Sequence, residues 1–307
     1  MAAITIQNVK DPVWGNCVHM ANGLVELLVT TDFGPRVISL SRIGMENMLH
    51  TDPEMKPLWD PFPEFNGDEF KLYGGHRLWI SPEVLPRCYH PDNKPVTCTP
   101  IDDGMTFTAA AEAWTGVQKS FSLRLSADSP SVSVMHTVTN VGAWDIELAL
   151  WGITMMAAGG KSVIPMPNSQ TGVLHNRTLS LWDYSDMNDP RVYWGKDYIT
   201  LTQDVSAIKP FKVGLNGDHG WGAYFNKGQL FVKYFEPASD GLYPDGGCSY
   251  ESYTNNLMLE SETLSEMMLL EPGESATHLE EWELHIADSI PSNDEAEISA
   301  VMAKYLV

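Results

Sequence analysis

The run SVSVMHTVTN at residues 131–140 carries the clearest structural signal in the chain. Three valines and His136 share one face of this run, and serine, methionine and threonine residues occupy the other. Because successive side chains of a strand point to opposite faces of a sheet, this alternation predicts a half-buried β-strand. The turn residues 140–142 follow, and we expect residues 146–156 to return as the second strand of a long antiparallel hairpin.

Short apolar runs separated by turn residues continue on both sides of this run. Residues 4–50 have the spacing of antiparallel strands joined by tight turns, and strand patterns return from Gly104 onward. The later candidates are divided by turns rich in glycine or proline. They comprise residues 223–225, 230–235, 249–254, 257–260 and 276–285. These patterns predict an all-β protein.

Only the end of the chain has a helical pattern. We expect Asn293 to cap a short helix, in which one stripe is formed by Ile298, Val301, Met302 and Tyr305. The sequence shows no repeat of solenoid or propeller period and no low-complexity linker. We therefore predict one domain, residues 1–307, built on a pair of large antiparallel sheets.

Composition excludes several classes of partner. The chain has 307 residues, 43% of them hydrophobic, which is enough for a large core. Its 19 Lys and Arg against 40 Asp and Glu give a net charge of −21, which argues against nucleic acid and anionic membranes as partners. No stretch approaches eighteen apolar residues, and residues 1–8 lack the basic start of a secretory signal. We expect a soluble, cytoplasmic protein.

The four cysteines show neither CxxC spacing nor a histidine pattern of the zinc type. They are Cys17, Cys88, Cys98 and Cys248. Asp240 and Asp245 could hold calcium through their oxygens, but two carboxylates do not specify a site. Free thiols are the simpler interpretation, and we expect no metal and no cofactor.

The stretch YGGHRLWISPE at residues 73–83 places an imidazole, a guanidinium and an indole within four positions, beside a tight turn. Its two glycines allow positive φ angles or a close backbone approach. If the next residues are extended, His76 lies on one face, and Arg77 and Trp79 lie on the other. This cluster could line a pocket from two sides, or divide between a pocket and the core. A buried histidine with ordinary structural partners is the alternative interpretation.

Residues 51–70 form a second feature, because this segment is rich in proline and acidic residues yet carries four aromatic side chains. These are Trp59, Phe62, Phe65 and Phe70. A loop must pack that many aromatic rings, so we expect it to lie over the domain or to rim a cleft.

The order of several motifs resembles that of the galactose mutarotase-like (aldose 1-epimerase-like) proteins, and the likeness spans most of the chain. It rests on FGPRVISL at 33–40, GGH at 74–76, LMLE at 257–260, LLEPGE at 269–274 and WEL at 282–284. More narrowly, residues 74–83, 89–93 and 272–284 are similar to a bacterial branch of that superfamily. The resemblance implies a β-supersandwich of large antiparallel sheets, to which the residue pattern adds the short C-terminal helix.

The resemblance also implies roles for two residues. Glu260 matches the general base that takes the proton of an anomeric hydroxyl, and His76 matches a histidine that helps to hold the ring oxygen. Mutarotases carry a second histidine on the strand after the 131–140 run, but here that strand reads ALWGIT at 149–154. Glu251 and Glu262 are near enough in sequence that either could be the working carboxylate instead.

Residue chemistry adds candidates for binding. Tryptophan faces suit a pyranose ring, and arginine pairs with carboxylate groups, so converging basic residues would favour an acidic sugar. Core packing and surface ion pairs explain such residues equally well. The predicted catalytic residues are Glu260 and His76, and the predicted substrate-binding residues are Arg77, Trp79, His90, Trp151, His175, Arg191 and Lys212.

These observations favour a carbohydrate-active protein whose partner is a small-molecule sugar or oligosaccharide. The first hypothesis is a mutarotase or epimerase that acts at the anomeric centre by general acid–base catalysis, which needs a base on the hydroxyl and an acid on the ring oxygen. A glycoside hydrolase or lyase that uses the same cleft is the second hypothesis. A non-catalytic carbohydrate-binding module is the third, because one fold hosts several functions.

Overall fold

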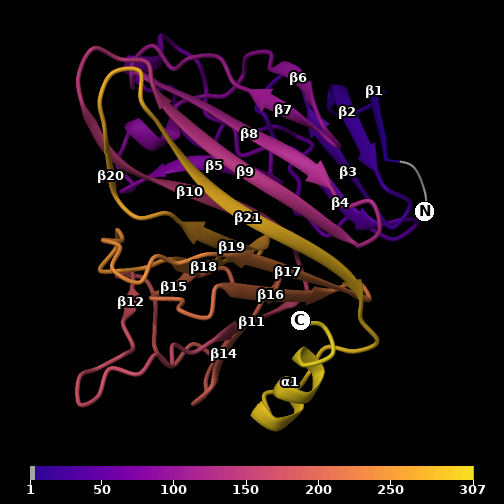
Figure 1. Cartoon of the computed structure of the whole chain (residues 1–307), viewed down its shortest axis with the longest axis vertical. Coiled ribbons are helices and arrows are strands. Elements are labelled where there is room, and N and C mark those ends of the chain that lie inside the picture. The colour runs from indigo at the N-terminus through magenta and orange to yellow at the C-terminus, as the bar shows by residue number, and fades with distance from the viewer. Residues whose placement is uncertain (1–3, 307) are drawn as a thin grey trace.

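The computed structural model describes residues 4–306, and within them the chain forms two large antiparallel sheets packed face to face (Figure 1). The long strand β21 (Ser275–Ile286) crosses the middle of the molecule in yellow and joins the two halves of the second sheet. The all-β prediction is confirmed. Residues 1–3, on which the absence of a secretory signal partly rests, lie outside the described residues.

The first sheet has 11 strands. In order across the sheet they are β1 (Thr5–Asp11), β2 (Gly15–Ala21), β3 (Val25–Thr30), β4 (Val37–Arg42), β5 (His76–Ser81), β10 (Ile146–Ala157), β19 (Met258–Leu264), β18 (Tyr250–Thr254), β15 (Phe211–Leu215) and β12 (Leu179–Leu181), with β20 (Met268–Leu270) paired to β10 outside this order.

The second sheet has 10 strands. In order they are β13 (Val192–Trp194), β14 (Tyr198–Thr202), β11 (Lys161–Pro165), β16 (Trp221–Asn226), β17 (Gln229–Phe235), β21, β9 (Ser131–Asn140), β8 (Val117–Leu125), β7 (Gly104–Thr108) and β6 (Thr97–Ile101). The helical elements of the described residues are α1 (Glu295–Met302) and the 3-10 turns η1 (Pro63–Phe65) and η2 (Arg87–Tyr89).

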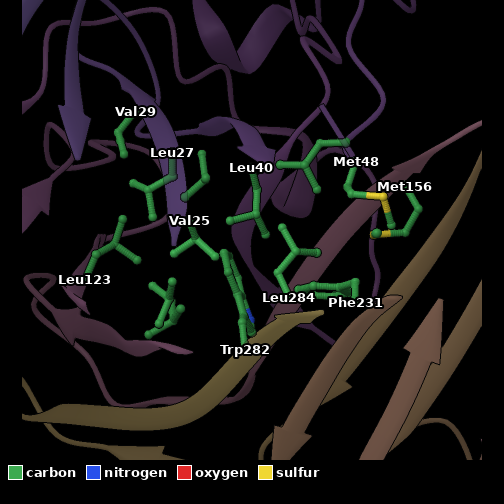
Figure 2. Close-up of a cluster of buried hydrophobic side chains, with 14 of the residues drawn as sticks. Val25, Leu27, Val29, Leu40, Met48, Leu123, Met156, Phe231, Trp282 and Leu284 are labelled. Carbon is green, nitrogen blue, oxygen red and sulfur yellow. The ribbon is translucent and has the colours of Figure 1, made fainter. Parts of the chain in front are cut away.

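The main core fills the space between the sheets. Figure 2 shows Val25, Leu27 and Leu40 of the first sheet pointing toward Trp282 of β21 in the second. The Trp282 side chain is among the largest that are fully buried, and rings of this size contribute a large share of the apolar area that a core removes from water. The apolar side chains of these strands therefore form the contact that holds the two sheets together.

The predicted hairpin is wrong, although both of its strands exist. β9 pairs with β8 and β21, whereas β10 pairs with β5 and β19 in the other sheet. The physical reason is burial, because β10 is buried on both faces from Leu148 to Ala157 and needs the middle of a covered sheet. The Asn140 side chain closes the connection by donating to the carbonyls of Trp144 and Leu270 at 2.8 and 2.9 Å.

The C-terminal helix is present, but its cap is one residue later than expected. Asp294 accepts from the backbone N–H of Glu297 at 2.9 Å, whereas Asn293 accepts from the Thr200 hydroxyl. Ile298 and Met302 are buried against the second sheet as predicted, and Val301 packs beside them, whereas Tyr305 lies beyond the end of the helix and packs against the same cluster. None of the described helices is long and apolar enough to cross a membrane. The assignment of the whole chain to one domain stays a prediction.

Gly75 is required where the chain enters β5, because its φ is +73° and a Cβ there would lie 2.2 Å from the Val37 carbonyl oxygen. We expect Gly75→Ala to destabilise the protein by more than the roughly 1–3 kcal/mol of a strained backbone conformation alone. Gly44 has a similar φ of +76°, and a Cβ there would meet no atom within 4 Å, so Gly44→Ala isolates the backbone cost. Urea unfolding compares the two, and equal losses would contradict this account of Gly75.

Candidate active site

A cleft of about 410 Å³ lies on the outer face of the first sheet, across strands β5, β10 and β19. We call it the main cleft. These strands are neighbours in register, with Arg77 opposite Ile153 and Ile153 opposite Glu262. The walls are aromatic and comprise Trp59, Phe70, Trp79, Tyr89, Trp151, Trp182, Tyr184 and Tyr253. The charged lining residues are Arg77, Glu83, Lys212 and Glu260.

Arg77 and Glu260 face each other in this cleft. The Arg77 Nη2 lies 3.9 Å from the Glu260 Oε1, and the guanidinium lies over the Trp79 ring at 4.1 Å. Arg77 is buried, yet its Nε has no hydrogen-bond partner in the described structure. Burial and the nearby Arg36 lower the pKa of Arg77 to about 10. The guanidinium therefore has hydrogen-bonding capacity left for a ligand.

Glu260 has the properties of an acid–base residue. Burial, and then the neighbouring Glu262 carboxylate, raise the pKa of Glu260 to about 7, while Arg77 and Lys212 oppose the rise. A carboxyl group with a pKa near neutrality can accept and return a proton at physiological pH. Because strongly shifted groups in clefts are common at functional sites, this position favours a chemical role for Glu260.

Lys212 lines the main cleft, and its ammonium group is already paired with two carboxylates and two aromatic rings. Its Nζ lies 2.7 Å from Glu251 and 3.0 Å from Glu262, and it sits over the rings of Trp151 and Trp182 at 4.6 and 4.5 Å. Although burial lowers the pKa of Lys212, the two carboxylates raise it more, to well above its usual value. Lys212 therefore stays protonated and holds both tryptophans in place.

Glu251 and Glu262 lie behind Lys212. Both are fully buried, and the Glu262 Oε2 also accepts from the Trp151 indole at 2.9 Å. Burial raises the pKa of Glu251 to about 8. These two carboxylates act on Lys212 and Trp151, whereas Glu260 is the one that lines the cleft.

The segment 51–70 rims the main cleft, as one of the two alternatives predicted. Trp59 packs edge-on against Tyr89 at 4.4 Å, and both rings line the cleft with Phe70. The Tyr89 hydroxyl donates to the Glu83 carboxylate, which fixes a second acidic group at the rim.

The expectation that His76 meets Glu260 in one cleft is wrong. His76 is 0% exposed and points the other way, into the space between the sheets. Its Nδ1 bonds to the Thr154 hydroxyl at 2.8 Å, and its Nε2 bonds to the Nε2 of His136 at 2.8 Å. The period of two in β5 sends Arg77 and Trp79 to the cleft and therefore sends His76 to the core. Burial holds the pKa of His76 well below its usual value.

His76 belongs to a buried polar network around Glu280. The Glu280 carboxylate accepts from Lys233 at 3.0 Å, from the Thr263 hydroxyl at 2.5 Å and from the Trp282 indole at 2.7 Å. Ligand atoms of His76, His136 and Glu280 lie within 4.8 Å of one another, which is close enough to consider a metal. Each of these groups is already engaged by protein partners, and the Lys233 ammonium already pairs with the Glu280 carboxylate. The network is therefore a buried ion pair between the sheets.

Three other predicted binding residues lie outside the main cleft. His90 packs on Phe65 and lines a separate cavity of about 30 Å³. His175 lines a different, polar hollow. Arg191 is buried against Asp189 at 2.7 Å and donates to the Lys209 carbonyl. The structure thus brings together Arg77, Trp79, Trp151, Lys212 and Glu260 in the main cleft, whereas His175 and Arg191 lie elsewhere and His90 meets Arg77 and Trp79 only at the small cavity.

Sequence reasoning missed the site roles of Glu83, Tyr89 and Tyr253. Tyr253 lies two residues after Glu251 on β18, so the period of two could have placed it on the same face. Glu83 and Tyr89 lie in a proline-rich connection whose path has no periodic signal.

Several solved protein structures have a fold similar to that of this chain. A galactose mutarotase-like protein from Clostridium acetobutylicum is 13% identical, with a TM-score of 0.53 over 92% of this chain and 99% of that one. One from Lactobacillus casei is 11% identical, with a TM-score of 0.54 over 88% of this chain and 100% of that one. A TPR-domain protein from Parabacteroides distasonis is 14% identical, with a TM-score of 0.60 over 88% of this chain and 47% of that one, so this chain spans about half its length.

No protein-family model matches the chain, and no curated protein matches it. At these identities the likeness concerns the fold. The chain has the galactose mutarotase-like β-sandwich fold, as the resemblance implied, and it carries a buried arginine–glutamate pair in a cleft walled by aromatic rings.

Proposed function

We propose that the main cleft binds a sugar and that the protein interconverts the anomers of that sugar. The observation that carries the proposal is Glu260, a buried carboxyl with a pKa of about 7 that faces Arg77 in an aromatic cleft. Aromatic faces pack on the C–H faces of a pyranose, and the charged pair is available for its polar edge. Similarity to galactose mutarotase-like structures supports the same class of ligand.

In this proposal the reaction needs only the two facing groups. The Glu260 carboxylate takes the proton of the anomeric hydroxyl, the anomeric carbon forms a carbonyl, and its bond to the ring oxygen breaks. Arg77 stabilises the negative charge that develops on the ring oxygen. The ring oxygen then attacks the other face of the carbonyl, and Glu260 returns the proton to the new hydroxyl.

The charges of the cleft favour a neutral sugar over an acidic one. The two basic lining residues, Arg77 and Lys212, already face the carboxylates of Glu260, Glu251 and Glu262. An anionic substituent would therefore find no cation in the lining that lacks a carboxylate partner. Convergence of further basic residues would have favoured an acidic sugar, but Arg191 is paired with Asp189 and does not line the cleft.

The test is anomer exchange, measured by saturation-transfer NMR on D-glucose, D-galactose and D-glucuronic acid. We expect catalysed exchange of a neutral sugar that rises as the pH passes through about 7, where Glu260 ionises, and falls as Arg77 loses its proton near 10. Binding without exchange would indicate a binding module. Neither binding nor exchange with any sugar would reject the proposal.

One observation favours glycoside hydrolysis as a second candidate. Glu83 lines the same cleft as Glu260, and glycosidases use two carboxyl groups that flank the bond they cleave. Release of a free monosaccharide from a disaccharide in the same NMR experiment would support this candidate.

A further inference from the structure

The main cleft does not end at the aromatic walls around Glu260. A second hollow of about 330 Å³ adjoins it, and four residues line both: Glu83, Tyr89, Trp151 and Trp182. We call this second space the outer hollow. Either volume alone lies within the range of roughly 300–1,000 Å³ that is common for ligand sites. The two hollows therefore lie side by side, and together they offer more room than a single ring needs.

The lining of the outer hollow suits another sugar ring. Beyond the shared residues it adds Asp245 and Leu85. The half-buried Trp182 offers apolar surface, and the carboxylates of Glu83 and Asp245 can accept hydrogen bonds from hydroxyl groups. A hollow with flat aromatic walls and acceptors at its edge matches the two kinds of surface that a pyranose presents.

These groups are held in position before any ligand arrives. Lys212 fixes the Trp182 ring through the contact at 4.5 Å, and the Tyr89 hydroxyl bonds to Glu83. Asp245 lies in a turn, and the Asp245 backbone carbonyl accepts a hydrogen bond from the Ser180 hydroxyl at 2.6 Å. Binding therefore orders few side chains, which favours affinity.

The charge of the outer hollow selects among rings. Among its lining residues the charged side chains are Glu83 and Asp245, both acidic. Lys212, which lies over the shared rings of Trp151 and Trp182, is already paired with Glu251 and Glu262. A uronic acid at this place would be repelled, whereas the hydroxyl groups of a neutral ring find two charged acceptors.

We propose that the outer hollow is a second sugar subsite, and that the substrate is a neutral oligosaccharide of two or more rings. Its reducing ring occupies the main cleft beside Glu260 and Arg77, and the next ring lies between Trp182 and Asp245. This inference rests on the proposed function, because it extends the same cleft. The inference goes beyond the proposed function because it assigns a second site with its own residues and charge preference.

The experiment compares cellobiose, maltose and lactose with D-glucose by titration calorimetry on the whole chain. We expect at least one disaccharide to bind about tenfold more tightly than glucose, which corresponds to roughly 1.4 kcal/mol. We expect Asp245→Asn to lower the affinity for that disaccharide about three- to tenfold more than the affinity for glucose. Asparagine tolerates the positive φ of 53° at this position, so the turn is kept.

Asp240→Asn is the matched control, because Asp240 lies in the same loop but is exposed and lines neither hollow. It should leave both affinities as they are. If glucose binds and no disaccharide binds more tightly, or if Asp245→Asn weakens both sugars equally, the subsite is rejected while the proposed function stands. If no mono- or disaccharide binds at all, both proposals fail together.

Discussion

Replacing Glu260 by glutamine should slow anomer exchange by about 10²–10⁴-fold, the usual contribution of a positioned general base. Glutamine keeps the shape of the side chain beside Arg77 but cannot take a proton from the anomeric hydroxyl. The loss should fall mainly on kcat, since the aromatic walls of the main cleft remain. Saturation-transfer NMR at pH 8, above the pKa of about 7, measures the wild-type carboxylate in its working form.

Glu271→Gln provides the matched control for this change. Glu271 is an exposed carboxylate in the turn after β20 and lines no hollow of the cleft. The anomer-exchange rate of the Glu271→Gln variant should equal that of the wild type. If Glu260→Gln keeps the full rate as well, Glu260 is not the base, and the proposed chemistry is wrong even where the sugar still binds.

Replacing Lys233 by methionine should destabilise the fold by about 3–5 kcal/mol, as expected when one partner of a buried ion pair is removed. Lys233 is 0% exposed and donates to Glu280 at 3.0 Å and to the carbonyls of Gly152 and Ser261 at 3.1 and 3.0 Å. Methionine leaves the Glu280 charge uncompensated between the sheets. Chemical denaturation followed by tryptophan fluorescence measures the free energy of unfolding.

The double variant Lys233→Met, Glu280→Gln tests the cause of this loss. It should be less destabilised than the sum of the two single variants, because no lone charge is left in the interior. Lys196→Met, at an exposed lysine, should change stability by no more than about 0.5 kcal/mol. Additive losses in the double variant would mean that the ion pair is not what couples the two residues.

The strands could be predicted from the sequence because the alternation of side chains is a local property. The 131–140 run has the bounds of β9, and the late candidates match β17, β18 and β21 to within one residue at each end, whereas those for β16 and β19 cover only part of each strand. Pairing is not local. β9 and β10 follow each other in the chain yet lie in different sheets, because the doubly buried β10 is stable only in the middle of the first sheet.

The candidate site shows the same division. The period of two separated His76 from Arg77 and Trp79, but it could not say which face would become the cleft. Packing of the second sheet decided this, because His136 covers the His76 side of β5. Lys212 met Glu251 and Glu262 only through the order of β15, β18 and β19 in the sheet.

The sequence by itself determined the all-β class, most strand positions and the short C-terminal helix, since each depends on neighbours a few residues apart. Only the tertiary structure decided the partners of each strand, the burial of His76 and the meeting of Arg77 with Glu260 at 3.9 Å. The reason is that long-range contacts are selected by the burial of whole strand faces, and no single stretch of the chain contains that information.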